Sequence, residues 1–276
     1  MGAPASWRAV DFVLIRHGQT SWNAEGIIQG QSDAPLDDVG RTQARLVGDA
    51  VASGRFGSVS LPIRSSDLSR AADTAAAVAA ALGATDDDVA HHPELRERHM
   101  GLLQGVPRRD VREDPTHARA WRAFRSGDDA ARVPGGGESF DDLWDRTVGF
   151  VERLAIEAAE TRHDDPPRLP IVTHGGVIHV FADRCRRDAG AFVPATGAGE
   201  DARDAPNPGD PVPVPVPTGV VRNCSVHVVR VHVPPRDARA RGDEPMWETV
   251  SWGDDAHLAG VAEGLPHGFG GTRDSA

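Results

Sequence analysis

The segment Phe12-Val13-Leu14-Ile15-Arg16-His17-Gly18 decides the fold of this 276-residue chain. Its first four residues are apolar and include β-branched side chains, a pattern that predicts a buried β-strand. The strand ends abruptly in a guanidinium group, an imidazole and a glycine. Open α/β sheets bind ligands at the carboxyl ends of their strands. We therefore expect Arg16 and His17 to lie at a ligand site, with Gly18 allowing the backbone to turn there.

Downstream of this segment, predicted strands and helices alternate along the chain. Apolar runs predict strands at 59–63, 169–173, 223–233 and 247–252, with a short strand within 91–97 and the 247–252 strand as an antiparallel edge. Amphipathic spacing predicts helices that begin near Asp37 or Asp38, at Ser66 or Asp67, at Ser139 and after His174, with shorter helical pieces at 108–112 and 116–124. This alternation predicts the α/β class, as a three-layer αβα sandwich with a mostly parallel central sheet.

The domain organisation follows from composition. We predict a single domain over residues 1–260, interrupted by a low-complexity insertion at 189–218 that is rich in proline, glycine and aspartate. Its alternating Pro-Val tract is typical of a polyproline spacer, although a docking peptide remains an alternative. Residues 261–276 form a glycine-rich tail without a core-forming pattern.

Composition also excludes several partners. The net charge of −11 argues against general binding to nucleic acid or to an anionic membrane surface. All 30 basic residues are arginine, so any fixed cation is a guanidinium group, whose fork fits phosphate oxygens. Two isolated cysteines, Cys185 and Cys224, predict reduced thiols and a cytoplasmic location. No apolar run is long enough to span a bilayer.

A second histidine gives the ligand site its chemistry. The predicted strand at 169–173 runs directly into His174, and the ends of parallel strands align, so His174 should meet His17. Arg16 and Arg70, the latter on the helix after the 59–63 strand, would join them. Two imidazoles and two guanidinium groups suit a dianionic phosphoryl group. A neutral imidazole can attack phosphorus, while the arginines stabilise the oxygens and disfavour protonation of His17.

Phosphoryl transfer also needs a proton for the leaving oxygen, and Glu97 is the candidate donor. Five motifs occur in order: Arg16-His17-Gly18 with Asn23 and Gln29-Gly30, Ser66-Asp67-Leu68-Ser69-Arg70-Ala71, Leu95-Arg96-Glu97-Arg98-His99, Pro134-Gly135-Gly136-Gly137-Glu138-Ser139, and Thr173-His174-Gly175-Gly176. Together they resemble the histidine phosphatase superfamily, the phosphoglycerate mutase-like proteins. The ending, with 252–258 and 268–271, is similar to the plant and algal branch of that family.

The resemblance implies a role for each matching residue. His17 would become phosphohistidine, and Arg16, Arg70 and His174 would complete the phosphate pocket. Glu97 would be the acid for the leaving group and then the base for water. The implied substrate-binding residues are Asn23, Gln29, Gly30, Arg98, Arg108 and Gly175, with Arg122 as a further candidate for an anionic group. The family implies no metal and no other cofactor.

Two activities share this machinery: mutases return the phosphoryl group to substrate, and phosphatases give it to water. Residues 97–105 are similar to the mutase motif. However, Met100 stands where mutases have tyrosine, Ala123 where they have a second arginine, and Gly176 where they have asparagine. We therefore favour a phosphatase of carbohydrate metabolism acting on a small phosphorylated metabolite such as a phosphorylated sugar, a sugar acid or phosphoserine.

Three further points stay open at this stage. A phosphoglycerate mutase is the first alternative, and a catalytically silent phosphate-binding protein is the second. The sequence also leaves open whether the chain forms a homodimer.

The remaining histidines are expected in packing or surface positions: His99, His179, His227, His232 and His257. The aromatic residues of the helix that begins at Ser139 are expected in the core.

Overall fold

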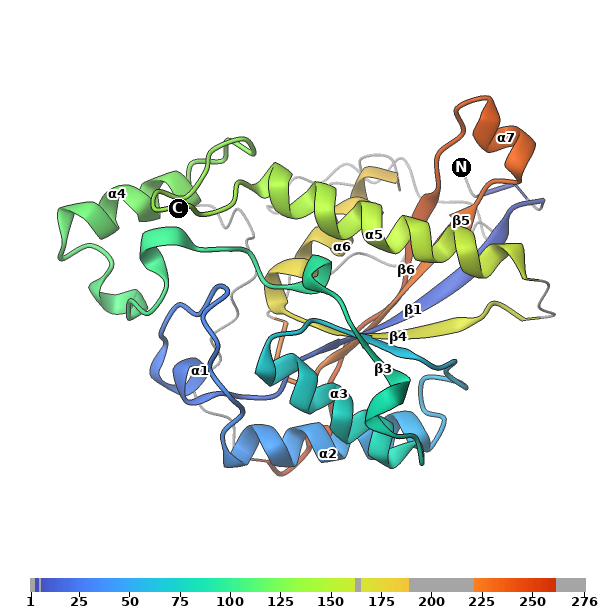
Figure 1. Ribbon diagram of the computed structural model, residues 1–276, viewed down its shortest axis with the longest axis horizontal. Coiled ribbons are helices and arrows are strands. Elements are labelled where there is room, and N and C mark those ends of the chain that lie inside the picture. Colours follow the sequence, from blue (N-terminus) through green and yellow to red (C-terminus); the bar gives the residue numbers. More distant parts are fainter. Residues whose placement is uncertain (1–2, 5, 162–164, 189–220, 262–276) are drawn as a thin grey trace, which may run out of the picture.

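The chain folds around one mixed sheet of six strands in the order β3-β2-β4-β1-β5-β6. The computed structural model describes residues 3–4, 6–161, 165–188 and 221–261 (Figure 1). The strands are β1 (Arg8–Arg16), β2 (Ile63–Ser65), β3 (Val89–His91), β4 (Arg168–Thr173), β5 (Val226–Val233) and β6 (Met246–Asp254). The first four in the sheet order, β3, β2, β4 and β1, run parallel, whereas β5 is antiparallel to both of its neighbours.

Helices cover both faces of this sheet. They are α1 (Ser21–Glu25), α2 (Asp38–Ala52), α3 (Ser69–Ala81), α4 (Pro115–Phe124), α5 (Phe140–Glu160), α6 (Gly175–Asp188) and α7 (Arg236–Ala240). In Figure 1, α5 and α6 lie on one side of the sheet and α2 and α3 on the other. The predicted three-layer α/β class is therefore confirmed.

The alternation of side chains in β1 explains why its sequence is an unbroken apolar run. Phe12 and Leu14 pack into the core beneath α5 and α6, and Val13 and Ile15 pack into the core beneath α2 and α3. All four are fully buried. A strand covered on both faces has no solvent-facing side, so both sets of alternate positions are apolar.

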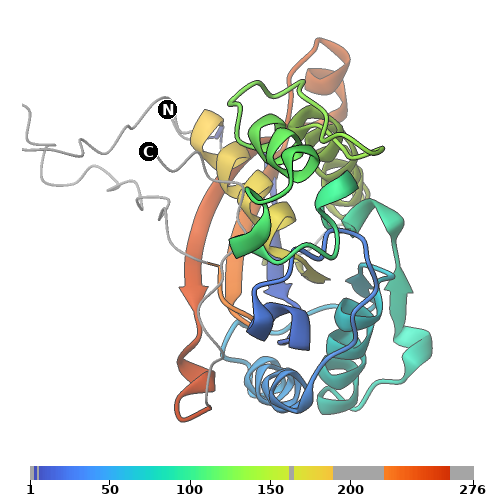
Figure 2. The same cartoon turned by 90° about the vertical axis from the view of Figure 1, so that its left-hand side faces the viewer.

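A third, smaller core lies in the segment 98–138, which we call the cap. Met100, Leu103, Val111 and Ala120 form part of it. The cap contains α4 and two short 3₁₀ turns, Gly101–Leu103 and Arg108–Asp110. Figure 2 shows α1 and the cap in front of the sheet, on the side where β1 ends. The cap therefore stands over the end of the sheet at which the sequence predicts a ligand site.

Two strand predictions are wrong in their limits. The strand predicted at 59–63 begins only at Ile63, and Leu61 is exposed. Pro62 has no amide hydrogen for a ladder bond, so the strand starts after it. The short strand predicted within 91–97 is displaced to Val89–His91, because Pro93 opens a 3₁₀ turn.

The predicted start of α3 is also wrong. Neither Ser66 nor Asp67 caps it, and the helix begins at Ser69. The Ser66 hydroxyl is hydrogen-bonded to the His174 ring at 2.8 Å, while Asp67 forms an ion pair with Arg96 at 2.6 Å. Asp33, from a distant loop, accepts from the amide of Ser69 at 2.8 Å instead. Tertiary contacts thus replaced the local cap that the sequence suggested.

The other helix starts are confirmed. Asp37 caps α2 by accepting from the amide of Gly40, and Ser139 forms a reciprocal capping box with Asp142 at α5. The predicted insertion at 189–218, and all of the predicted tail except residue 261, lie outside the described residues. Among the residues that are described, no helix has both the length and the hydrophobicity needed to cross a bilayer.

Candidate active site

His17 occupies the first position after β1, and its backbone is fixed on several sides. Its amide donates to the Thr173 carbonyl at 2.9 Å, and its carbonyl accepts from the Asn223 side chain at 2.9 Å. Next to it, a Cβ atom on Gly18 would lie 2.5 Å from the Gly40 carbonyl oxygen. Gly18 is therefore required because α2 approaches the backbone closely, rather than for an unusual turn. These contacts hold the His17 ring in one place at the end of the sheet.

The hydrogen bond of the His17 ring defines its tautomer. Nδ1 lies 2.7 Å from the carbonyl oxygen of Gly18. A carbonyl only accepts, so Nδ1 carries the proton in the neutral ring and Nε2 keeps its lone pair. The ring is therefore oriented with a nucleophilic nitrogen on the side away from its own backbone.

The other three predicted pocket residues converge on this ring. The His17 and His174 ring centroids are 5.1 Å apart. Arg16 donates to the Val221 carbonyl, and Arg70 donates to the Ser32 and Gly30 carbonyls at 2.9 and 2.7 Å. These four side chains, which we call the pocket floor, come from β1, α3 and the end of β4, and none is more than 4% exposed.

Three buried nitrogens of the pocket floor lack a hydrogen-bond partner among the described residues: Arg16 Nε, Arg70 Nε and His174 Nδ1. Buried polar atoms are nearly always paired, because an unpaired one costs about 1–3 kcal/mol. An anion bound beside His17 would accept from such donors. The geometry therefore suits a small oxyanion.

Burial and charge keep both histidines neutral. The pKa of His17 is lowered well below 6.5, first by its burial and then by the charges of Arg70 and Arg16. Burial and Arg70 lower the pKa of His174 in the same way. From the sequence we expected the arginines alone to disfavour protonation of His17. The structure shows that the loss of solvation on burial is the larger cause of its lowered pKa. Burial also lowers the pKa of both Arg16 and Arg70 to about 10, so both remain charged at neutral pH.

Glu97 lines the same pocket as His17, Arg16 and Arg70. Its carboxylate accepts from two backbone amides, those of Arg98 at 2.8 Å and Gly176 at 3.0 Å. A Cβ atom on Gly176 would lie only 2.1 Å from Glu97 Oε1. Glycine at this position therefore leaves the space that the carboxylate occupies.

The pocket extends outward from the floor between α1, the cap and the start of α5. With its open mouth it encloses about 790 Å³, a size typical of sites for small molecules. Five of the predicted substrate-binding residues line it: Asn23, Gln29, Gly30, Arg98 and Arg108. Gly175 does not line it, whereas the following residue, Gly176, does. Arg122 is exposed on α4 and does not line it either.

Sequence reasoning missed most of the apolar wall. Phe140 and His179 had been assigned to packing or to the surface, yet both line the pocket. The other lining residues not predicted are Trp22, Gly26, Ile27, Ile28, Met100, Phe124, Leu143 and Gly176. An apolar side chain on a helix face looks the same in sequence whether it faces a core or a cavity. Only the position of Met100, beside Glu97 in the motif, could have signalled this location.

Comparisons with known proteins identify the family of the chain. The model of the histidine phosphatase superfamily (branch 1) matches residues 12–191. Phosphoglycerate mutase-like protein 4 of Arabidopsis thaliana is 33% identical over 96% of this chain and 94% of its own length. The metal-independent phosphoserine phosphatase of the same plant is 34% identical over 95% of this chain and 88% of its own length.

Solved structures give the same answer. The native structure of mycobacterial glucosyl-3-phosphoglycerate phosphatase superimposes with a TM-score of 0.64 at 28% identity, covering 89% of this chain and 99% of that one. A phosphoglycerate mutase from Bacillus anthracis, at 18% identity and a TM-score of 0.63, shares the fold. The chain belongs to the histidine phosphatase superfamily, on its phosphoglycerate mutase-like side.

Proposed function

We propose that this protein is a phosphatase that hydrolyses a small phosphomonoester through a phosphohistidine on His17. One observation carries the proposal: two neutral imidazoles and two guanidinium groups lie together in one buried place, and three of their nitrogens lack a hydrogen-bond partner among the described residues. This is a site for a phosphoryl group in which one ring nitrogen has a free lone pair.

The reaction takes place in two steps. His17 Nε2 attacks phosphorus, the bond from phosphorus to the ester oxygen breaks, and Glu97 gives its proton to that oxygen. Water then attacks the phosphorus, Glu97 takes a proton from the water, and the bond from phosphorus to nitrogen breaks to release inorganic phosphate. Arg16, Arg70 and His174 bind the non-bridging oxygens throughout, where charge is spread in the transition state.

The pocket wall favours a small phosphorylated acid as the substrate. Arg98 and Arg108 also line the pocket, where they would bind a carboxylate, together with apolar side chains such as Met100 and Phe124. Two relatives act on substrates that their names give as phosphoserine and glucosyl-3-phosphoglycerate. Both names denote compounds that carry a carboxylate near a phosphate, which supports the same class here.

A substrate panel tests the proposal. Phosphoserine, phosphoglycerate isomers and sugar phosphates would be incubated with the purified protein, and phosphorus NMR would follow both free phosphate and isomer exchange. We expect free phosphate, together with an acid-labile phosphoenzyme, and turnover that survives a metal chelator. Isomer exchange without net phosphate release would identify a mutase instead. Neither reaction, with no phosphoenzyme, would leave a silent binding protein.

A further inference from the structure

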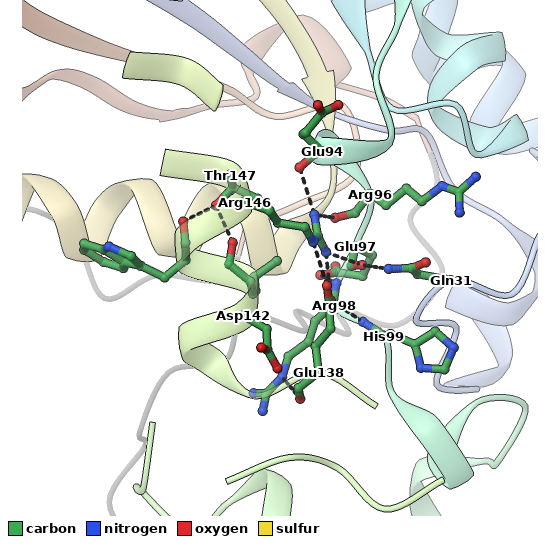
Figure 3. Close-up of polar contacts among 12 residues, drawn as sticks. Gln31, Glu94, Arg96, Glu97, Arg98, His99, Glu138, Asp142, Arg146 and Thr147 are labelled. Carbon is green, nitrogen blue, oxygen red and sulfur yellow. Dashed lines mark hydrogen bonds and ion pairs between the residues drawn. The ribbon is translucent and has the colours of Figure 1, made fainter. Parts of the chain in front are cut away.

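Outside the reacting groups, a network of polar contacts holds the backbone that carries Glu97. Glu97 belongs to the segment 94–99, which leaves the 3₁₀ turn Pro93–Leu95 and enters the cap without regular secondary structure beyond that turn. Such a segment has no ladder or helix to satisfy its carbonyl groups or to fix its course. Its position must come from other contacts, and Figure 3 shows that they centre on Arg146 of α5.

Arg146 uses all five N–H groups that a guanidinium carries. Nη1 donates to the carbonyls of Glu94 and Arg96, both at 2.8 Å. Nη2 donates to the carbonyl of Glu97 at 2.9 Å and to Glu138 Oε2 at 2.8 Å. Nε donates to Glu138 Oε1 at 2.7 Å. Three carbonyls of the segment 94–99 are therefore bound by one side chain on the longest helix (Figure 3).

Glu138 also holds the segment 94–99, and we call Arg146 and Glu138 together the clamp. Its Oε2 also accepts from the amide of His99 at 2.8 Å, and its backbone amide donates to the His99 carbonyl at 2.9 Å. Burial acts to raise the pKa of Glu138, but the hydrogen bonds and charge of Arg146 outweigh it and lower that pKa. The carboxylate is therefore ionised at neutral pH, and it holds both Arg146 and the segment 94–99.

We infer that Arg146 and Glu138 are positioning residues that aim the Glu97 carboxyl group at the leaving oxygen. This inference rests on the proposed function, because it assigns the proton transfer to Glu97. Neither Arg146 nor Glu138 lines the pocket. Both act through the backbone, which leaves the Glu97 side chain to bond with the amides of Arg98 and Gly176. A displacement of about 1 Å at a reacting group can cost about 10²-fold in rate.

The test compares two kinds of leaving group, because a misplaced acid matters only where the leaving oxygen needs a proton. We would measure kcat/KM for phosphoserine, an alkyl phosphate, and for 4-nitrophenyl phosphate, whose phenolate leaves unprotonated. In Arg146→Lys, the charge remains but three donors cannot span five acceptors. We expect a loss of about 10²-fold with phosphoserine and of less than about 10-fold with 4-nitrophenyl phosphate.

A matched control is available in α6. Arg184 is also largely buried and ion-paired, with Glu152 and Asp188, but among the described residues none of its hydrogen-bond or ion-pair partners lines the pocket. Arg184→Lys should change kcat/KM equally for both substrates. Inhibition by inorganic phosphate should be the same in wild type and in Arg146→Lys, because the pocket floor is untouched.

Each outcome decides between the alternatives. An equal loss with both substrates, or no loss, in a folded Arg146→Lys variant would overturn the positioning role. If that variant does not fold, Glu138→Gln, which removes the negative charge and turns one of the two acceptor oxygens into a donor, must show the same selective loss for the inference to hold. If the wild-type protein hydrolyses neither substrate, the proposed function itself is wrong. If the wild type is active and Arg146→Lys loses the same activity with both substrates, only the positioning role is wrong.

Discussion

The pocket floor and the pocket wall are built in different ways. The floor consists of Arg16, His17, Arg70 and His174, which follow strands of the sheet or stand on α3, and all four are buried. The wall comes largely from α1 and the loop 26–30 after it, from the cap and from α5, where side chains such as Arg108 and Phe140 are partly exposed. The floor is rigid because the sheet places its members. The wall depends on short turns and a small core of its own.

This difference suggests that the floor carries out the chemistry and that the wall selects the substrate. A floor that surrounds one phosphoryl-sized spot can do the same chemistry on any phosphomonoester that reaches it. A wall made by an irregular segment selects which ester does so, as is usual when loops carry specificity on a fixed scaffold. Changes in the floor should therefore affect every substrate, and changes in the wall should affect particular ones.

The strongest test of the floor is His17→Ala. It removes the nucleophile while leaving the backbone contacts of residue 17 in place, so we expect turnover to fall by at least about 10³-fold on all substrates. The acid-labile phosphoenzyme should disappear in the same preparation, as rapid acid quenching would reveal. A variant that keeps its turnover, or still forms the phosphoenzyme, would contradict the assignment of the floor.

Gly176→Ala tests the boundary between floor and wall. The new methyl group would meet the end of the Glu97 side chain, which can move aside, and alanine is favourable in a helix. We expect the melting temperature to stay the same or rise, while kcat/KM with phosphoserine falls by about 10²-fold. Unchanged kcat/KM would mean that the position of Glu97 in this structure is not the one that matters for turnover. Thermal unfolding and steady-state kinetics measure the two effects separately.

The sequence predicted the floor well and the wall poorly, for a physical reason. A buried parallel strand shows as an apolar run, and the alignment of strand ends brings His17 and His174 together without further information. No comparable rule positions the cap, whose Met100 and Phe124 could have packed inward or faced a cavity. Contacts between distant segments also escaped prediction: Ser66 binds the ring of His174 instead of capping α3, and Asp33 supplies the amide contact instead.

The wall itself is tested by a pair of arginines that looked alike in the sequence. Arg108 lines the pocket, and Arg122 is exposed on α4 and does not. If Arg108 binds the carboxylate of a phosphorylated acid, Arg108→Ala should raise KM for phosphoserine by about 10-fold, with little change for a phosphomonoester that lacks a carboxylate, such as 4-nitrophenyl phosphate. Arg122→Ala should change neither. Equal effects of the two substitutions would mean that the wall does not select by charge.

The smallest effect on activity should come from mild acidification. The pKa values of His17 and His174 lie well below 6.5, so both rings stay neutral. After correction for protonation of the substrate phosphate, whose second pKa is about 6, we expect kcat/KM to change by less than about 2-fold between pH 7 and pH 6. Stability should respond differently, because the same histidines take up protons near pH 6.5 once the chain is unfolded.

Each histidine whose pKa is lowered in the folded state adds stability above pH 6.5 that is lost as the pH falls. The loss is up to about 1.4 kcal/mol per pH unit for each ring. His227, whose pKa burial lowers to about 3, adds a third such group outside the pocket floor. Denaturant titrations should therefore show the free energy of unfolding falling from pH 7 to pH 5. The fall should be shallower in His17→Ala, which has one such ring fewer. An acid limb near pH 6.5 that remains in kcat/KM after the ionisation of the substrate phosphate is corrected for, or an equal slope in His17→Ala, would show that His17 is not held neutral by the floor.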